Sequence, residues 1–128
     1  MKHIKRVYVA GLYSRNADGS VADVIGVLNN IRAGQKASLE VLRNGFAVFC
    51  PWLDYQFALL DDDPIEKEVY MQNSMAWLEV SDAVLVISGN GIGGGVDAEI
   101  EKAFDLCIPV FYSLGDLKAW AKVWDGEA

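Results

Sequence analysis

Hydrophobic residues gather in four short runs that are spaced along the chain. The runs cover residues 4–10, 46–50, 82–88 and 108–112. They are rich in β-branched and aromatic residues, which predicts four strands. The run at 46–50 has no polar interruption, which is typical of a strand that is covered on both faces.

The segments between these runs predict helices. Apolar residues recur at helical spacing from residue 21 to about Asn44, where Gly45 supplies a stop. This helix is expected to bury one stripe: Val24, Val27, Leu28, Ile31, Leu39 and Leu42. Further helices are expected at 65–80, with Pro64 at its first position, at 96–106 and at 116–124. In the helix at 96–106, Ile100, Ala103 and Phe104 are expected to face inward. Residues 52–63 are expected to be irregular.

Strand and helix therefore alternate with short links, which predicts an α/β domain. Connections of this kind are right-handed crossovers, and they produce a parallel sheet, here of four to five strands, that is flanked by helices. With 128 residues, about half of them apolar, the chain suits one domain over 1–128. Ligands bind such sheets beyond the carboxyl ends of the strands, so the loops after the first and third strands are the expected site.

Charge and composition narrow the expected partners. Eighteen acidic residues against eleven Lys and Arg give a net charge of −7, which argues against nucleic acid as a partner. No stretch is apolar enough for a membrane span or a signal peptide, so a cytoplasmic protein without a membrane partner is expected.

No metal site and no cofactor are expected either. His3 is the only histidine and lies at the N-terminal end, and Cys50 and Cys107 have no partners at ligand spacing. Both cysteines fall in apolar runs, so they are expected to be inert core thiols.

The loop after the third strand carries the most unusual composition. Five of the seven residues from Gly89 to Gly95 are glycines. So much glycine lets the backbone approach a ligand closely, and the helix start that follows favours an anionic group. A mobile connector is the alternative interpretation.

Two acids, Asp97 and Glu99, begin the helix that follows this loop. A carboxylate there is held ionised, as a nucleophile or an acceptor of sugar hydroxyls requires, but the ordinary role of such acids is helix capping, which local physics alone favours. Glu99 lies four residues before Ala103 and so on the same helix side, which directs it toward the crevice at the strand ends.

These residues resemble a known superfamily. The stretch from Gly95 through Glu99 to Ala103 is similar to the Gly-x-x-x-Glu-(Ile/Leu)-x-x-Ala signature of nucleoside 2-deoxyribosyltransferases and related nucleotide N-glycosidases, and the short chain looks closest to small members of the DUF4406 type. Three other segments agree with the superfamily pattern: Val7-Tyr-Val-Ala-Gly11, Phe49-Cys-Pro51 and Trp77-Leu-Glu-Val-Ser-Asp-Ala-Val-Leu-Val86. The resemblance implies a three-layer flavodoxin/Rossmann-like sandwich.

The resemblance also implies roles for single residues. Glu99 would be the nucleophile that attacks the anomeric carbon, and Tyr8 would orient it, although Tyr8 is equally well a core aromatic. The implied substrate-binding residues are Gly11, Tyr13, Ser14 and Arg15 in the first loop and Ser88, Gly89, Gly93 and Gly95 in the glycine loop. Arg15 is the guanidinium available for a phosphate, or simply a solvated side chain.

Two departures from the superfamily pattern bear on activity. Residues 73–77 carry no carboxylate where the relatives place an acid that protonates the leaving base, and Gly93 stands where they carry a polar residue. Asp97 and the acids at 61–63 are candidates to replace the missing acid.

The sequence thus supports an N-glycosidic bond hydrolase or (deoxy)ribosyltransferase that acts on a nucleoside or nucleoside monophosphate. The alternative is a non-catalytic module that binds a nucleotide or ribosyl metabolite. Aromatic and aliphatic residues at 52–60, together with Trp120 and Trp124, predict a self-association surface and a homo-oligomer.

Overall fold

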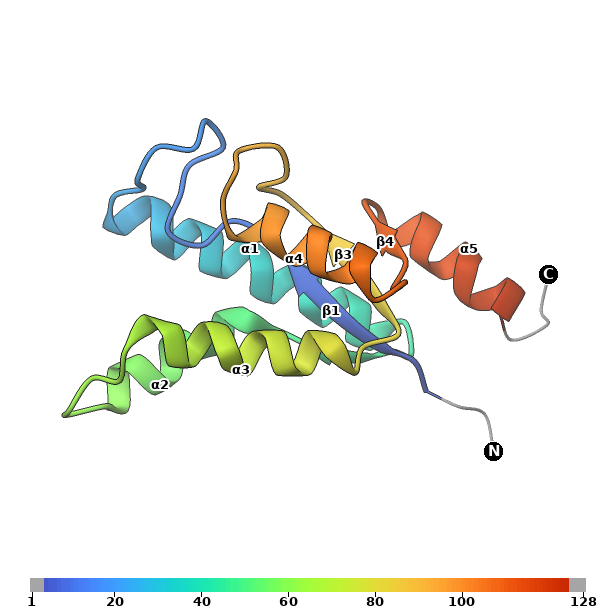
Figure 1. The fold of residues 1–128 in the computed structure, drawn as a ribbon, viewed down its shortest axis with the longest axis horizontal. Helices are drawn as coiled ribbons and strands as arrows, with labels where there is room; N and C mark the ends of the chain where they lie inside the picture. The colour runs from blue at the N-terminus through green and yellow to red at the C-terminus, as the bar shows by residue number, and fades with distance from the viewer. Residues whose placement is uncertain (1–3, 125–128) are drawn as a thin grey trace.

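The computed structural model describes residues 4–124 and contains one sheet of four parallel strands (Figure 1). The strands are β1 (Arg6–Ala10), β2 (Ala47–Phe49), β3 (Ala83–Val86) and β4 (Val110–Phe111), in the spatial order β2-β1-β3-β4. The helices are α1 (Val24–Arg43), the short 3-10 helix η1 (Pro51–Leu53), α2 (Asp54–Leu60), α3 (Lys67–Glu79), α4 (Gly95–Asp105) and α5 (Leu114–Trp124). The predicted α/β class and the parallel sheet are confirmed, and the strand order is that of flavodoxin-like folds.

The helices cover the sheet in two layers. Residues of α1 and α5 pack with Val7, Val9 and Leu85 on one face. Residues of α3 and α4 pack with Tyr8 and Val84 on the other. The alternation of side chains along β1 thus supplies both halves of the core, and the three-layer sandwich expected from the sequence is confirmed.

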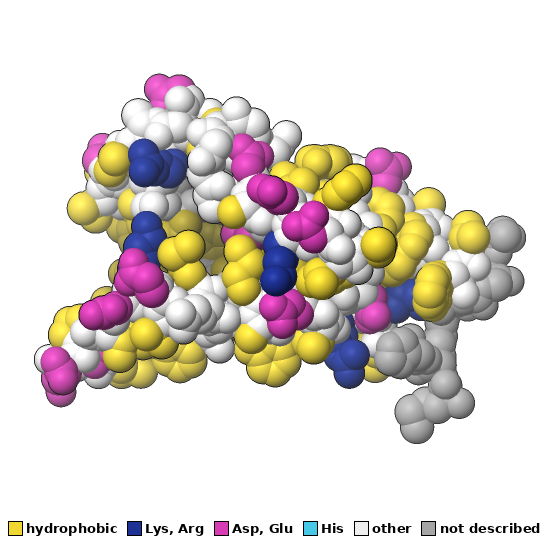
Figure 2. All heavy atoms as spheres, viewed as in Figure 1, with side chains coloured by type: hydrophobic (Ala, Val, Ile, Leu, Met, Phe, Trp, Pro, Cys, Tyr) yellow, Lys and Arg dark blue, Asp and Glu magenta, His cyan; other side chains and the backbone are white. Residues whose placement is uncertain are grey.

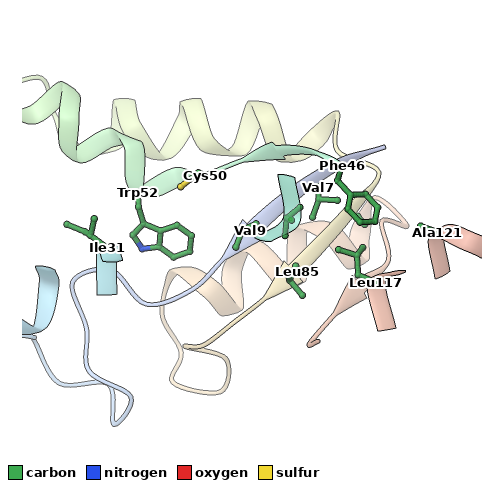
Figure 3. Close-up of a cluster of buried hydrophobic side chains, with 11 residues drawn as sticks. Val7, Val9, Ile31, Phe46, Cys50, Trp52, Leu85, Leu117 and Ala121 are labelled. Carbon is green, nitrogen blue, oxygen red and sulfur yellow. The ribbon is translucent and has the colours of Figure 1, made fainter. Parts of the chain in front are cut away.

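A buried tryptophan organises the core on the α1 face (Figure 3). Trp52 in η1 is only 1% exposed, and its indole lies directly against Gly34 of α1. A Cβ atom at Gly34 would stand 2.1 Å from the ring, so only glycine allows this contact. The packing fixes η1, and with it the start of α2, at the carboxyl end of the sheet.

The buried stripe of α1 differs from the predicted one. The helix buries Ile31, Gly34, Ser38 and Val41, whereas Leu39 and Leu42 are largely exposed. Small residues face the sheet and Trp52 here, so apolar character alone pointed to the wrong side after Ile31. Val24 and Leu28 are also exposed, because the first turns of the helix extend past the sheet (Figure 1).

Several other local predictions were wrong. Residues 52–63 contain η1 and α2 instead of irregular chain, and α3 begins at Lys67, so Pro64 precedes the helix and does not open it. The strand β2 lies at the edge of the sheet and is partly exposed, so it is not covered on both faces.

Two side chains predicted to be buried in the core are exposed. Phe104 on α4 is 81% exposed, because α4 turns Ala103 toward the sheet. Cys107 is exposed at a positive φ of 58° in the turn between α4 and β4, while Cys50 is buried as expected.

The predicted self-association surface is only partly present. Trp52 is buried, but Phe57 and Leu60 of α2 and Trp124 of α5 are exposed. Homo-oligomerisation stays a prediction. Among residues 4–124, no helix is long and apolar enough to cross a membrane.

Candidate active site

The site expected from the topology lies where the chain reverses its direction across the sheet. From β1 the chain continues to β2 on one side of the sheet, and from β3 it continues to β4 on the other side. The loops after the neighbouring strands β1 and β3 therefore lead away from each other. A crevice at the carboxyl ends of such strands is the usual ligand site of this fold.

The two loops approach each other closely at Gly11. A Cβ atom there would lie 2.7 Å from Cγ1 of Ile87 and 3.0 Å from the Trp52 ring, so the position requires glycine. Beyond Gly11, the Leu12 amide donates to Oγ of Ser88 at 3.0 Å, and the indole of Trp52 donates to the Leu12 carbonyl at 2.9 Å. The base of the site is therefore rigid.

The remainder of the first loop is tied to α1. The Asn30 side-chain amide donates to the carbonyls of Tyr13 and Arg15 at 2.9 and 3.0 Å, and the Ser14 carbonyl accepts from the amide of Ala22. The guanidinium of Arg15 donates to the Gly19 carbonyl at 3.1 Å and is exposed. The structure thus shows Arg15 bound within its own loop, and a phosphate contact by Arg15 stays a prediction.

The glycine loop is held in place by Asp97. Gly89, Gly91 and Gly93 all have positive φ, between 75° and 87°, which glycine adopts without strain. The Asp97 carboxylate accepts from the amides of Gly91 and Gly93 at 2.7 and 2.6 Å. These hydrogen bonds lower the pKa of Asp97 below its usual value. The geometry favours a positioning role for Asp97 over donation of a proton to a leaving group.

Glu99 is directed inward, as expected. Its Oε2 atom is buried without a hydrogen-bond partner among the described residues, and burial raises the pKa of the carboxyl to about 7. Gly95 lies beside it, since a Cβ atom there would stand 3.9 Å from Oε1. A buried acceptor that lacks a donor is uncommon in native proteins and is typical of functional sites.

Tyr8 is the partner of Glu99. The Tyr8 hydroxyl hydrogen-bonds to the Glu99 carboxyl, which opposes the rise in the pKa of Glu99. Burial and the neighbouring Glu99 raise the pKa of Tyr8 far above its ordinary value, so the phenol stays protonated as a donor. Ser74 of α3 hydrogen-bonds to the same hydroxyl, and the Tyr8 ring stacks on Phe49 at 5.3 Å between centroids.

Comparison with known families gives a match over most of the chain. The model described as "Domain of unknown function (DUF7768)" matches residues 5–113. The chain belongs to the DUF7768 family. The matched family is thus not the expected DUF4406 type, and no curated protein matches.

Among solved structures, the DUF7768 domain resembles a 2-deoxyribosyltransferase from the psychrotolerant bacterium Bacillus psychrosaccharolyticus. The two chains are 17% identical, and the likeness covers 82% of this chain and 69% of that one with a TM-score of 0.57. At this identity the likeness shows the fold.

Four half-buried residues that the sequence did not single out lie near the site of the DUF7768 domain. Asp54 of α2 interacts electrostatically with both Tyr8 and Tyr13, and Tyr13 also interacts with Tyr55 and Tyr70. The sequence did offer one indication for Asp54, namely that it closely follows β2 and so lies at the carboxyl end of the sheet. Ser74, Tyr55 and Tyr70 have no comparable signal.

The surface is hollowed on this side of the domain. Figure 2 shows a recess at the left of the view, between α1 with the loop before it and the pair α2 and α3, with hydrophobic side chains at its back. Tyr13, Asp54 and Tyr70 come from the elements that flank this recess.

A second hollow, of about 240 Å³, lies between α1 and α5, on the face of the sheet that α3 and α4 do not cover. It is lined by Ala37, Glu40, Leu85, Ile87, Tyr112, Ser113 and Leu114. None of the predicted site residues lines it. Among the described residues, no group of three or more His, Cys, Asp or Glu is placed to hold a metal ion.

Proposed function

We propose that this DUF7768 domain breaks the N-glycosidic bond of a nucleoside or nucleoside monophosphate through a covalent glycosyl ester on Glu99. The observation that carries this proposal is the Glu99 carboxyl itself. The residue is half-buried in the first turns of α4, its Oε2 atom is buried with no partner among the described residues, and the Tyr8 phenol hydrogen-bonds to the carboxyl. The fold shared with a deoxyribosyltransferase supports the same reaction class.

The proposed reaction is a double displacement. A carboxylate oxygen of Glu99 attacks the anomeric carbon, the bond to the base breaks with its electron pair on the base nitrogen, and a glycosyl ester forms. Water then attacks the ester to release the sugar, which makes the enzyme a hydrolase. A second base that attacks in its place makes it a (deoxy)ribosyltransferase. This displacement draws only on side chains of the chain and on no cofactor.

The ionisation of Glu99 sets the expected pH dependence. The attacking form is the carboxylate, and the pKa of Glu99 is raised to about 7 by burial. Ionisation of Glu99 therefore makes the rate rise with pH toward about pH 7, and a group that protonates the departing base makes the rate fall again once that group has lost its proton. The Tyr8 hydroxyl stays protonated over this range and donates to the carboxylate. A nucleoside or nucleotide substrate suits the cytoplasmic location expected from the sequence, which stays a prediction.

A module that binds a nucleotide or ribosyl metabolite without breaking it is the second candidate. The observation that favours it is the absence of a carboxylate at residues 73–77 of α3, where the hydroxyl of Ser74 faces Tyr8 instead. Without a proton donor, an ordinary base is a poor leaving group.

A panel assay separates the two functions. The protein is incubated with deoxynucleosides, ribonucleosides and their monophosphates, and free base is followed by chromatography. Wild type and the control Glu101→Gln, an exposed position on the same helix, are expected to release base, and Glu99→Gln to lose about a thousandfold or more of the rate.

Base release that survives Glu99→Gln would contradict the role of Glu99. If no base appears but a nucleotide raises the melting temperature of the wild type, the binding module is the correct function, since a ligand that binds only the folded state stabilises it.

A further inference from the structure

We propose that Asp54 is the acid that protonates the departing base, taking the place of the carboxylate that α3 lacks. This inference rests on the proposed function and goes beyond it by assigning the proton donor and the side of the site where the base lies. It places the base in the recess flanked by Tyr13, α2 and α3, and the sugar between the base and Glu99.

The backbone around Asp54 is fixed by buried contacts. Asp54 is the first residue of α2 and follows η1, whose Trp52 is buried against Gly34 of α1. The Trp52 indole also donates to the carbonyl of Leu12 in the loop after β1. Asp54 is thus held at the carboxyl end of the sheet by the same tryptophan that anchors the first loop of the site.

Asp54 lies within electrostatic reach of the tyrosine that contacts the proposed nucleophile. It is close enough to interact electrostatically with Tyr8, which hydrogen-bonds to Glu99, and it interacts in the same way with Tyr13. A nucleophile and a proton donor on two carboxyl groups that flank the scissile bond are the usual requirement for breaking a glycosidic bond.

The surroundings of Asp54 suit a flat aromatic base. Tyr13 interacts electrostatically with Tyr55 and with Tyr70, and like Asp54 the three tyrosines are half-buried. They come from the loop after β1, from α2 and from α3, the elements that flank the recess in Figure 2. Tyrosine rings present apolar faces on which a base can stack while the hydroxyls remain free for polar contacts.

Two of the other candidate acids are already engaged. Both oxygens of Asp97 accept from amides of the glycine loop, and both oxygens of Asp61 accept from the amides of Asp63 and Ile65. For Asp54, by contrast, burial raises the pKa and no hydrogen bond within the described part of the chain lowers it. Asp54 is therefore more easily protonated than Asp97, whose pKa is lowered.

In the proposed reaction, Asp54 gives up its proton as the bond to the base breaks. As the bond between the anomeric carbon and the base nitrogen breaks, its electron pair stays on the base, and the carboxyl proton of Asp54 moves to a ring nitrogen of the base. The base leaves neutral, Asp54 becomes a carboxylate, and the sugar is esterified on Glu99. In hydrolysis, the Asp54 carboxylate then accepts a proton from the water that attacks the ester.

Two substrates that differ in their need for an acid test this assignment. A purine deoxynucleoside needs protonation to leave, whereas its N7-methylated counterpart already carries a positive charge on the base. Asp54→Asn is expected to lower kcat/KM for the unmodified substrate by about a hundredfold or more, and for the methylated one by less than about threefold. Asp54→Glu, which restores a carboxyl, is expected to recover part of the loss. Asp105→Asn, an exposed position at the far end of α4, is the control and keeps both rates.

Each other result overturns a stated part of the proposal. An equal loss of kcat/KM on both substrates would mean that Asp54→Asn disturbs the structure of the site and that Asp54 is not shown to donate a proton. Full activity of Asp54→Asn on the unmodified purine would mean that Asp54 is not the acid. In both cases the role of Glu99 stands. If wild type cleaves neither substrate, the proposed function itself fails, and the assignment of Asp54 fails with it.

Discussion

Replacing Glu99 by glutamine is expected to change how the stability of the protein depends on pH. Burial raises the pKa of this carboxyl from its ordinary value of 4.5 to about 7. Between these values the folded protein keeps a proton that the unfolded chain releases, so rising pH favours unfolding. The penalty is absent below about pH 4.5 and complete above about pH 7.

The size of the effect follows from the two pKa values. A pKa difference from 4.5 to about 7, at about 1.4 kcal/mol for each tenfold change in the ionisation constant, amounts to about 3 kcal/mol. Wild type should therefore lose about 3 kcal/mol of unfolding free energy through Glu99 between pH 4.5 and 8. Glu99→Gln has no carboxyl to ionise and should lack this component, so it becomes the more stable protein at pH 8.

Urea unfolding at pH 5 and pH 8 measures the effect. Because part of the penalty is already present at pH 5, about 2.5 kcal/mol remains to be lost by pH 8. For a urea dependence of about 2 kcal/mol per molar, the midpoint of wild type should fall by about 1.3 M more than that of Glu99→Gln between the two pH values. Glu101→Gln is the matched control, because it makes the same change at an exposed position of the same helix, and it should follow wild type. If all three proteins show the same pH dependence, Glu99 is not a buried group with a raised pKa, and the reasoning fails.

Two further predictions concern packing and assembly. Gly34→Ala is expected to lower the unfolding free energy by about 3 kcal/mol, because the added Cβ atom meets the buried Trp52 ring; Gly115→Ala, where the nearest atom is 4.0 Å away, should cost little, and urea unfolding of both variants checks this. The exposed Phe57 and Leu60 of α2 and Trp124 of α5 are expected to support a homo-oligomer by burying apolar surface, which sedimentation analysis would contradict by finding a monomer.

The sequence was sufficient to predict the fold because apolar runs typical of strands alternate clearly with segments whose apolar residues have helical spacing. The apolar runs around Tyr8 and Val84 could only be strands buried between helices, and their order with the intervening helices implied a parallel sheet. The inward direction of Glu99 could also be predicted, since its spacing from Ala103 directs both toward the sheet.

The missed features depend on contacts between distant segments. The buried face of α1 was mispredicted because Gly34 and Ser38 are small residues that accommodate Trp52 and the sheet, and no local pattern reveals that partner. Asp54 lies in a segment without periodicity, so its electrostatic interaction with Tyr8 became visible only after η1 and α2 were positioned. Cys107 looked like a strand residue because an apolar run continues through the turn where it lies.

The most direct test of the account is to look for the covalent intermediate. The protein is incubated with a nucleoside that carries fluorine at C2 of the sugar, which slows breakdown of a glycosyl ester, and its peptides are then analysed by mass spectrometry. We expect one glycosyl group per chain on the peptide that contains Glu99, and no adduct on Glu99→Gln. An adduct on another residue, or base release from the natural nucleoside without any adduct from the fluorinated one, would contradict the proposal that Glu99 is the nucleophile.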